Sequence, residues 1–145
     1  METKFAPFEF DFDTIEDQII KTLGRNFFYY YSLDLLSSCP KPIGVQTVRI
    51  VIWEMDGYFY PKHLDDCYNK KGLFPNPWEL ISLAIKQAYL KNKGKDVVTQ
   101  WKDSNNNFFH MVYSYWNRDD GRKIFLLRGG AVPRSNFLCS GSIKT

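Results

Sequence analysis

The chain has 145 residues, of which 44% are hydrophobic and 24% charged, so it is long enough to bury its own core and too ordinary in composition for a disordered or coiled-coil protein. Its net charge of +3 is mild. Aromatic residues make up 17% of the chain, a share that suits a small core, a ligand pocket or a protein interface equally well.

The charge is unevenly distributed. Residues 1–36 hold seven acids and three bases, a net charge of −4, which leaves +7 for the remainder. We therefore expect an acidic N-terminal segment that folds onto a more basic body, within a single domain that spans residues 1–145.

Targeting and redox signals are lacking in the sequence. No apolar run has the length of a membrane span, and acids and phenylalanines stand where a signal peptide would need a basic and then an aliphatic region. Cys39, Cys67 and Cys139 are widely separated, without a Cys-x-x-Cys pair, which is typical of reduced thiols. We expect a cytoplasmic protein without a cofactor.

The first element is the stretch FEFDFD, in which Phe8, Phe10 and Phe12 alternate with acids. This period of two predicts a strand with one buried face, so we interpret residues 1–12 as an extended arm or edge strand. The arm packs either on its own sheet or on a partner subunit, and an exchanged arm would make a homodimer.

Helices are expected next. Asp13 can cap a helix with Ile15, Ile19, Ile20 and Leu23 on one side and Gly24 as its end. Residues 27–37 suit a helix or a buried strand, and we favour the helix.

A strand and a hairpin follow. Residues 45–53 are β-branched and partly alternating, which predicts a strand. Asp56-Gly57 is a turn signal, so Tyr58 to Tyr60 should pair back onto that strand until Pro61 interrupts it. The composition of residues 61–75 predicts polar, irregular structure.

The clearest helix begins at Asn76, a natural N-cap, with Pro77 in the first position and Glu79 at the capping-box position. It should bury one stripe (Trp78, Ile81, Ala84, Ile85 and Ala88) and end at Gly94. Four strands then follow, over residues 96–102, 107–117, 122–128 and 135–140, separated by turn signals. They predict a C-terminal antiparallel meander.

This order of N-terminal helices, β-hairpin, long capped helix and meander predicts an α+β protein with a curved sheet. It resembles the cone-shaped fold of the nuclear transport factor two family by the order of elements, without a shared residue motif. The resemblance implies a pocket or a dimerisation face, and because the fold carries enzymes, scaffolds and inhibitors, it leaves function open.

Two constellations suggest chemistry. His63, Asp65, Asp66 and Cys67 are metal-ligand types within five residues, although we interpret them as a polar surface loop and predict no metal. His110 lies between Phe109 and Met111 in a predicted strand, where a packed histidine is favoured; in a catalytic pocket, His110 or Tyr113 would be the acid-base group.

The end of the long helix suggests nucleic-acid binding, because five lysines gather there: Lys86, Lys91, Lys93, Lys95 and Lys102. The helix dipole alone explains cations at this place, so single-stranded nucleic-acid binding is a secondary alternative.

The surplus of aromatic residues indicates a binding surface. Both faces of the strand from Phe108 to Trp116 are aromatic, so one should be core and the other, unless the N-terminal arm covers it, an exposed patch. The predicted partner-binding residues are Tyr113, Tyr115, Trp116, Arg128, Trp53, Tyr58 and Tyr60. We predict a non-enzymatic protein-binding module, such as an inhibitor, immunity or anti-defence protein. The alternative is a small-ligand binder or enzyme that uses a cone-fold pocket.

Overall fold

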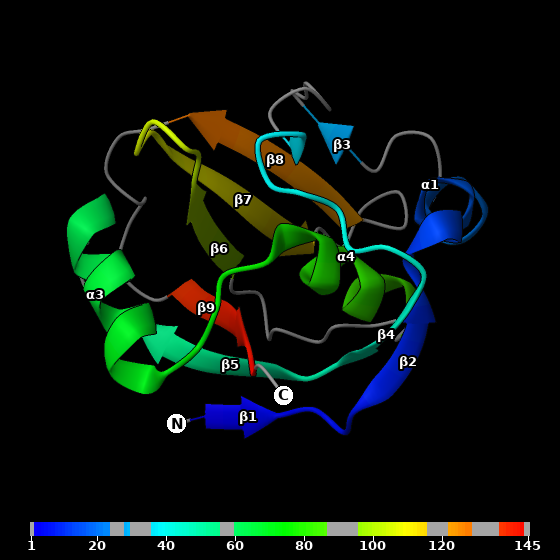
Figure 1. Cartoon of the computed structure of the whole chain (residues 1–145), viewed down its shortest axis with the longest axis horizontal. Helices are drawn as coiled ribbons and strands as arrows, with labels where there is room; N and C mark the ends of the chain where they lie inside the picture. The colour runs from blue at the N-terminus through cyan, green and yellow to red at the C-terminus, as the bar shows by residue number, and fades with distance from the viewer. Residues whose placement is uncertain are drawn as a thin grey trace.

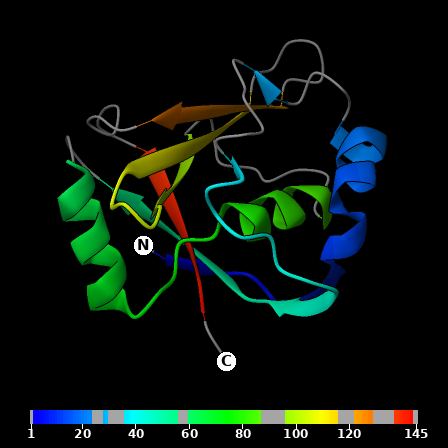
Figure 2. The same ribbon diagram turned by 45° about the horizontal axis from the view of Figure 1, so that its top comes forward.

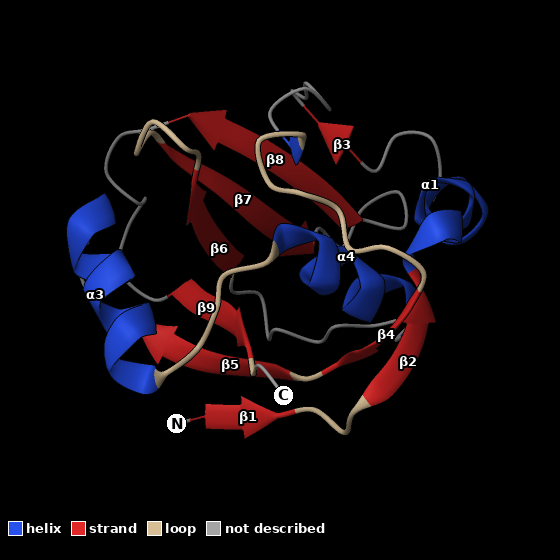
Figure 3. Cartoon of the chain, in the orientation of Figure 1, coloured by secondary structure: helices blue, strands red, loops and turns tan. Residues whose placement is uncertain are grey.

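The computed structural model describes residues 2–23, 28–29, 36–55, 60–86, 96–115, 122–128 and 137–143. It is an α+β arrangement, as the sequence predicts, with one mixed sheet in the order β1-β5-β9-β6-β7-β8-β3 and a two-stranded sheet of β2 and β4. Figure 1 shows the large sheet bending around helix α4, and Figure 3 separates helices from strands by colour.

The strands are β1 (Glu2–Lys4), β2 (Phe8–Asp11), β3 (Phe28–Tyr29), β4 (Val45–Val48), β5 (Ile50–Met55), β6 (Val97–Lys102), β7 (Phe108–Tyr115), β8 (Arg122–Arg128) and β9 (Phe137–Ser142). The helices are the 3₁₀ turn η1 (Phe12–Thr14), α1 (Ile15–Gln18), the π-helix η2 (Ile19–Leu23), α3 (Pro61–Lys71) and α4 (Pro77–Lys86).

Buried apolar side chains form two clusters on opposite faces of the large sheet. The α4-side cluster contains Phe10, Phe12, Ile15, Ile19, Leu36, Val48, Ile50, Ile52, Trp78, Leu80, Ile81, Leu83, Ala84, Ile85, Val97, Trp101, Phe109, Met111 and Tyr113. The α3-side cluster contains Val51, Trp53, Met55, Leu64, Tyr68, Leu73, Val98, Val112 and Cys139. Successive residues of β5, β6 and β7 alternate between the clusters, as the period of a strand requires. Both faces of the sheet are therefore core.

The N-terminal arm forms two strands, β1 against β5 and β2 against β4, both antiparallel. Lys4 faces Val51, and Phe8 faces Val48. Between these two pairs, the arm advances by four residues and the β4–β5 segment by three, so the arm holds one extra residue. Such a bulge shifts the alternation of side chains, which lets Phe5 and Phe8 pack against the same α4-side cluster.

The first helix has the expected place but a different start. Asp11 is the N-cap of η1, because its Oδ1 accepts from the Asp13 N–H at 3.1 Å. Asp13 itself reaches across to the Gly44 N–H at 3.0 Å, so the prediction that Asp13 caps the helix is wrong. Of the three isoleucines expected on one side, Ile15 and Ile19 are buried, whereas Ile20 is exposed.

The segment of residues 27–37, for which a helix is favoured by the sequence, contains a strand at Phe28–Tyr29. This strand, β3, runs parallel to β8 at the edge of the sheet. A run of aromatic residues is compatible with either a helix or a buried strand, and the pairing of Phe28 and Tyr29 with β8 makes this part a strand. Residues 24–27 and 30–35 lie outside the described part.

The predicted hairpin after β5 is not formed at Tyr60, which is the N-cap of helix α3. Residues 56–59 lie outside the described part. The prediction of irregular structure for 61–75 is wrong over α3, because Pro61 opens that helix and Gly72 ends it in the left-handed conformation. Leu64 and Tyr68 are one turn apart and both buried, a signal that the polar composition of the segment hides.

Helix α4 begins as expected. Asn76 Oδ1 accepts from the backbone N–H groups of Trp78 (3.0 Å) and Glu79 (3.3 Å), which confirms the cap. Burial is wider than the predicted stripe, since Leu80, Ser82 and Leu83 are buried as well. Ala88 and Gly94 lie outside the described part. A helix buried nearly all round lies inside the protein, where the sheet and the N-terminal segments surround it.

Four strands are found where the sequence predicts them; β6 and β7 begin one residue later than predicted, β8 has the predicted bounds and β9 ends two residues later. β6, β7 and β8 form an antiparallel meander. The prediction of a fourth consecutive neighbour is wrong. β9 lies between β5 and β6, antiparallel to β5 and parallel to β6, instead of next to β8. Turn signals in the sequence locate strands but do not predict which edge of the sheet the last strand joins. Here β9 pairs with β5 on the side opposite to β1.

The sheet opens between β6 and β9, because only Val97 and Val98 pair with β9. The Tyr68 hydroxyl enters the opening: it donates to the Ser140 carbonyl at 2.7 Å and accepts from the Gln100 N–H at 3.4 Å. One step further, Phe74 exchanges two backbone hydrogen bonds with Ser142, at 2.9 and 2.7 Å. The segment from α3 to α4 thus satisfies backbone groups that a regular ladder would pair.

Gly141 makes this insertion possible. A Cβ atom there would lie 3.0 Å from Leu73 Cβ and 3.1 Å from Tyr68 Cε1, which is tighter than most packed Cβ contacts, so a larger residue would push these neighbours away. A glycine in the interior of β9 therefore marks a close approach between the sheet and α3.

Among the described residues, none of the helices combines the length and the apolar character needed to cross a membrane.

Removal of the Tyr68 hydroxyl tests the role of the opening. We expect Tyr68→Phe to lower the free energy of unfolding by about 1–3 kcal/mol, because the Ser140 carbonyl loses the closer of its two hydroxyl donors, Tyr68 and Thr99, and the Gln100 N–H loses its acceptor. The same substitution at exposed Tyr60 is the matched control and should change stability by less than about 0.5 kcal/mol. Urea unfolding followed by circular dichroism measures both; equal stability of the two variants would contradict the role of the hydroxyl.

Candidate functional site

From Phe109 to Tyr113, the aromatic strand β7 is buried on both faces, which overturns the prediction of an exposed face for this part of the strand. Phe109, Met111 and Tyr113 belong to the α4-side cluster, while His110 and Val112 are buried on the other face. Tyr113 is fully buried, so its prediction as a surface anchor is wrong. The reason is helix α3, which covers the second face and which the polar composition of its segment conceals.

The remaining predicted partner-binding residues have different outcomes. Trp53 is buried against Tyr68, with ring centroids 5.5 Å apart, so the expectation of an exposed Trp53 is also wrong. Tyr60 is 64% exposed. Tyr58 and Trp116 lie outside the described residues, as do the side chains of Tyr115 and Arg128.

His110 is part of a buried hydrogen-bonded chain. Its Nε2 lies 2.7 Å from Gln100 Oε1, and Gln100 Nε2 donates to the Pro61 carbonyl at 2.7 Å. Because an amide oxygen only accepts, His110 carries its proton on Nε2. Burial lowers the pKa of His110 to about 4, so the ring is neutral at pH 7. These hydrogen bonds fasten the start of α3 to the sheet, so His110 has a structural role.

The possible metal ligands are spread around α3. Asp65 forms an ion pair with Lys102 at 3.2 Å, the His63 ring packs edge-on against Tyr60, and Cys67 packs against the α3-side cluster. Within the described ranges, no group of three or more His, Cys, Asp or Glu side chains could hold a metal ion.

The cysteines are free thiols. Burial, and secondly the Glu79 carboxylate, raises the pKa of Cys39 to about 12, and burial raises the pKa of Cys139 well above its usual value. Both are therefore protonated at pH 7 and are weak nucleophiles. Burial also raises the pKa of half-buried Glu79, while hydrogen bonds from Ser142 and Asn76 oppose this shift.

The lysines proposed for nucleic-acid binding are only partly described. Lys86 is exposed, and Lys102 is paired with Asp65. Lys91, Lys93 and Lys95 lie outside the described residues, so the basic surface stays a prediction.

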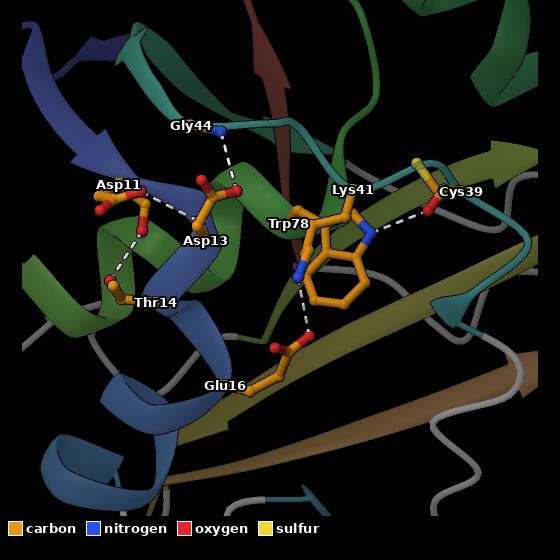
Figure 4. A network of polar contacts seen from close by, with 8 residues as sticks. All are labelled: Asp11, Asp13, Thr14, Glu16, Cys39, Lys41, Gly44 and Trp78. Carbon is orange, nitrogen blue, oxygen red and sulfur yellow. Dashed lines mark hydrogen bonds and ion pairs between the residues drawn. The ribbon is translucent and has the colours of Figure 1, made fainter.

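A polar network fixes the segment before β4 (Figure 4). The Trp78 indole N–H donates to the Cys39 carbonyl at 2.8 Å, which ties the segment to α4. Lys41 forms an ion pair with Glu16 of α1 at 3.0 Å. The Asp13 carboxylate accepts the Gly44 N–H, and Gly44 takes a positive φ of 67°. Three elements therefore hold residues 39–44 in one conformation.

This fixed segment presents apolar side chains to solvent. Ile43 is 79% exposed and Val45 is 61% exposed, on either side of Gly44. Ile20, 54% exposed, follows Glu16 by about one helical turn. α1 and β4 lie at the same end of the molecule in Figures 1 and 2. We call Ile20, Ile43 and Val45 the β4-end residues.

Sequence reasoning misses the β4-end residues. The stretch CPKPIG indicates only that helix and strand are unfavourable, and the alternation after it places Val45 at the start of a strand. Two apolar residues around a glycine, next to two prolines, are the available signal, but their exposure depends on what packs nearby.

Comparison of the chain with protein-family models, curated proteins and solved structures gives no match. The resemblance to the nuclear transport factor two family therefore stays a prediction.

The buried histidine generates a prediction of pH dependence. The unfolded chain protonates this ring near the usual histidine pKa of 6.5 and the folded chain only near 4, so the unfolded state binds more protons between these values. The contribution of His110 to stability is complete above pH 6.5 and falls by up to about 3 kcal/mol as the pH drops to 4.

Urea unfolding at several pH values checks this expectation. We expect His110→Gln to lose part of the acid dependence, whereas His63→Gln, at an exposed position, controls for the loss of a histidine and should behave like the wild type. Parallel pH profiles for wild type and His110→Gln would show that another group causes the acid sensitivity.

Proposed function

We propose that this chain is a non-enzymatic protein-binding module of the cytoplasm that acts through the β4 end of the molecule. An inhibitor, an immunity protein or an anti-defence protein belongs to this class. The observation that carries the proposal is the strong exposure of Ile43 and Val45 on a segment that hydrogen bonds and an ion pair hold in place.

Exposed apolar groups on a fixed backbone suit binding for a physical reason. Association costs conformational freedom, and a segment that is already ordered loses little of it. Ile43 and Val45 are branched and stiff, so their own loss of rotamer entropy is also small.

The charges near these side chains add specificity. Glu9, Asp13, Glu16 and Asp17 are exposed on the arm and on α1. Only Glu16 among them has an ion pair within the described residues. An acidic border around apolar groups favours a partner with a basic surface and speeds their encounter.

Support for a catalytic alternative is weaker. The buried side chains of His110 and Tyr68 are engaged in structural hydrogen bonds. The protein-binding surface that we propose is therefore at the β4 end and not on the meander. Of the partner-binding residues predicted from the sequence, Tyr60 is exposed.

Substitution of two of the β4-end residues, Ile43 and Val45, tests the proposal. The tagged protein is used to capture partners from a native lysate of the source cells, and mass spectrometry identifies them. We expect the double variant Ile43→Asp, Val45→Asp to retain at most a tenth of the partner that the wild type retains, because two buried carboxylates would replace apolar contacts.

The matched control is Tyr60→Asp with Phe74→Asp, an exposed apolar pair on either side of helix α3. Circular dichroism confirms that both double variants fold. Retention of the same partner by the β4-end variant, or the absence of any stoichiometric partner, would contradict the proposal.

A further inference from the structure

The hydrogen-bond pattern of β4 shows which of its backbone groups face away from β2. The Phe12 N–H donates to the Gly44 carbonyl at 2.9 Å, so this pair belongs to the hydrogen-bonded rungs of the antiparallel ladder. Rungs alternate, and Gln46, two residues on, therefore also bonds to β2. It follows that the N–H and C=O groups of Val45 and Thr47 point to the opposite edge.

That outer edge continues the edge on which β9 pairs with β5. β9 follows β5 from Met55 to Ile50, and the Ile143 N–H then donates to the Arg49 carbonyl at 2.9 Å. Within the described residues, the ladder stops there, and no strand pairs with the outer edge of β4. The side chains of Val45, Gln46 and Thr47 are all exposed.

The β4 edge differs from the neighbouring strand edges in its lack of charge. On β1, the outward residues are Glu2 and Lys4; on β2, they are Glu9 and Asp11. Charged residues on an edge discourage the addition of another strand. The outward residues of β4, Val45 and Thr47, carry no charge, and neither a proline nor a bulge interrupts the strand.

The surroundings of this edge indicate what would bind it. Glu9 lies directly across from Thr47, and Asp11 across from Val45, so both carboxylates share the solvent face of the small sheet. A lysine or arginine on an added strand could cover Val45 with its aliphatic stem while its charged end reaches these carboxylates. A second copy of this chain would bring no matching basic groups on its own β4.

We propose that β4 accepts an extended basic segment of the protein partner as an additional strand. The inference rests on the proposed function and names the recognition mode: main-chain bonds to Val45 and Thr47 give affinity, and basic side chains facing Glu9 and Asp11 give specificity.

The full-length protein and a synthetic probe test this mode directly. The probe is the capped peptide acetyl-Lys-Val-Lys-Val-Lys-Val-amide at millimolar concentration, and the readout is amide hydrogen exchange by NMR. We expect at least tenfold slower exchange for the Val45 and Thr47 amides and no comparable change for Gln46, whose N–H is already bonded to β2. No protection of Val45 and Thr47 overturns the proposal.

Two control peptides separate the main-chain and charge contributions. The counterpart with glutamate in place of lysine should bind at least tenfold more weakly. The lysine peptide can be N-methylated on either of its two alternate sets of amides, and methylation of the set that faces β4 should abolish the protection of the Val45 and Thr47 amides. Equal binding of the lysine and glutamate peptides would refute the basic preference. Self-association of the free protein, with the same amides protected and no peptide present, would identify a second copy as the occupant and would also refute it.

A proline variant separates this inference from the proposed function. Thr47→Pro removes an outward N–H without removing a bond to β2, and Lys4→Pro makes the same change on the outer edge of β1. We expect Thr47→Pro, and not Lys4→Pro, to weaken the peptide and the cellular partner at least tenfold. A partner that is lost with Ile43→Asp, Val45→Asp but kept with Thr47→Pro would leave protein binding intact and refute strand addition.

Discussion

The junction between β6 and β9 depends on the Tyr68 hydroxyl, which lies in the opening between these two strands. A parallel pair that separates after two residues leaves buried backbone groups without partners, and each such group would cost about 1–3 kcal/mol. The Tyr68 hydroxyl donates to the Ser140 carbonyl and accepts from the Gln100 N–H at this point. Phe74 then pairs with both backbone groups of Ser142. Because Tyr68 belongs to α3, this helix must lie against the sheet for β9 to occupy its place.

The same arrangement explains why the aromatic strand is core. α4 fills the concave side of the sheet, and α3 covers the other side, so Phe109, Met111 and Tyr113 of β7 pack in one cluster and Val112 packs in the other. An aromatic-rich strand is then a packing requirement of a sheet buried on both faces. The exposed aliphatic residues Ile43 and Val45 lie at the β4 end, where the small two-stranded sheet has an unpaired edge within the described residues.

Local sequence signals predict elements well where the physics is local. Asn76 caps α4 through its own side chain, and the strands at 97–102, 108–115 and 122–128 follow from alternation between turn signals. The errors arise where distant contacts decide. Asp13 bonds Gly44 instead of its own helix, β3 is a strand because β8 lies beside it, and α3 is hidden by a polar composition that buries only Leu64 and Tyr68 fully.

By itself, the sequence determined the α+β class, the start of α4 and the extended character of the acidic arm, because capping and periodicity act over a few residues. Only the tertiary structure decided that β9 joins β5 and β6, that Tyr113 and Trp53 are buried, and that Ile43 and Val45 are exposed. Burial depends on which elements meet in space, and residues as far apart as Tyr68 and Ser140 bring those elements together.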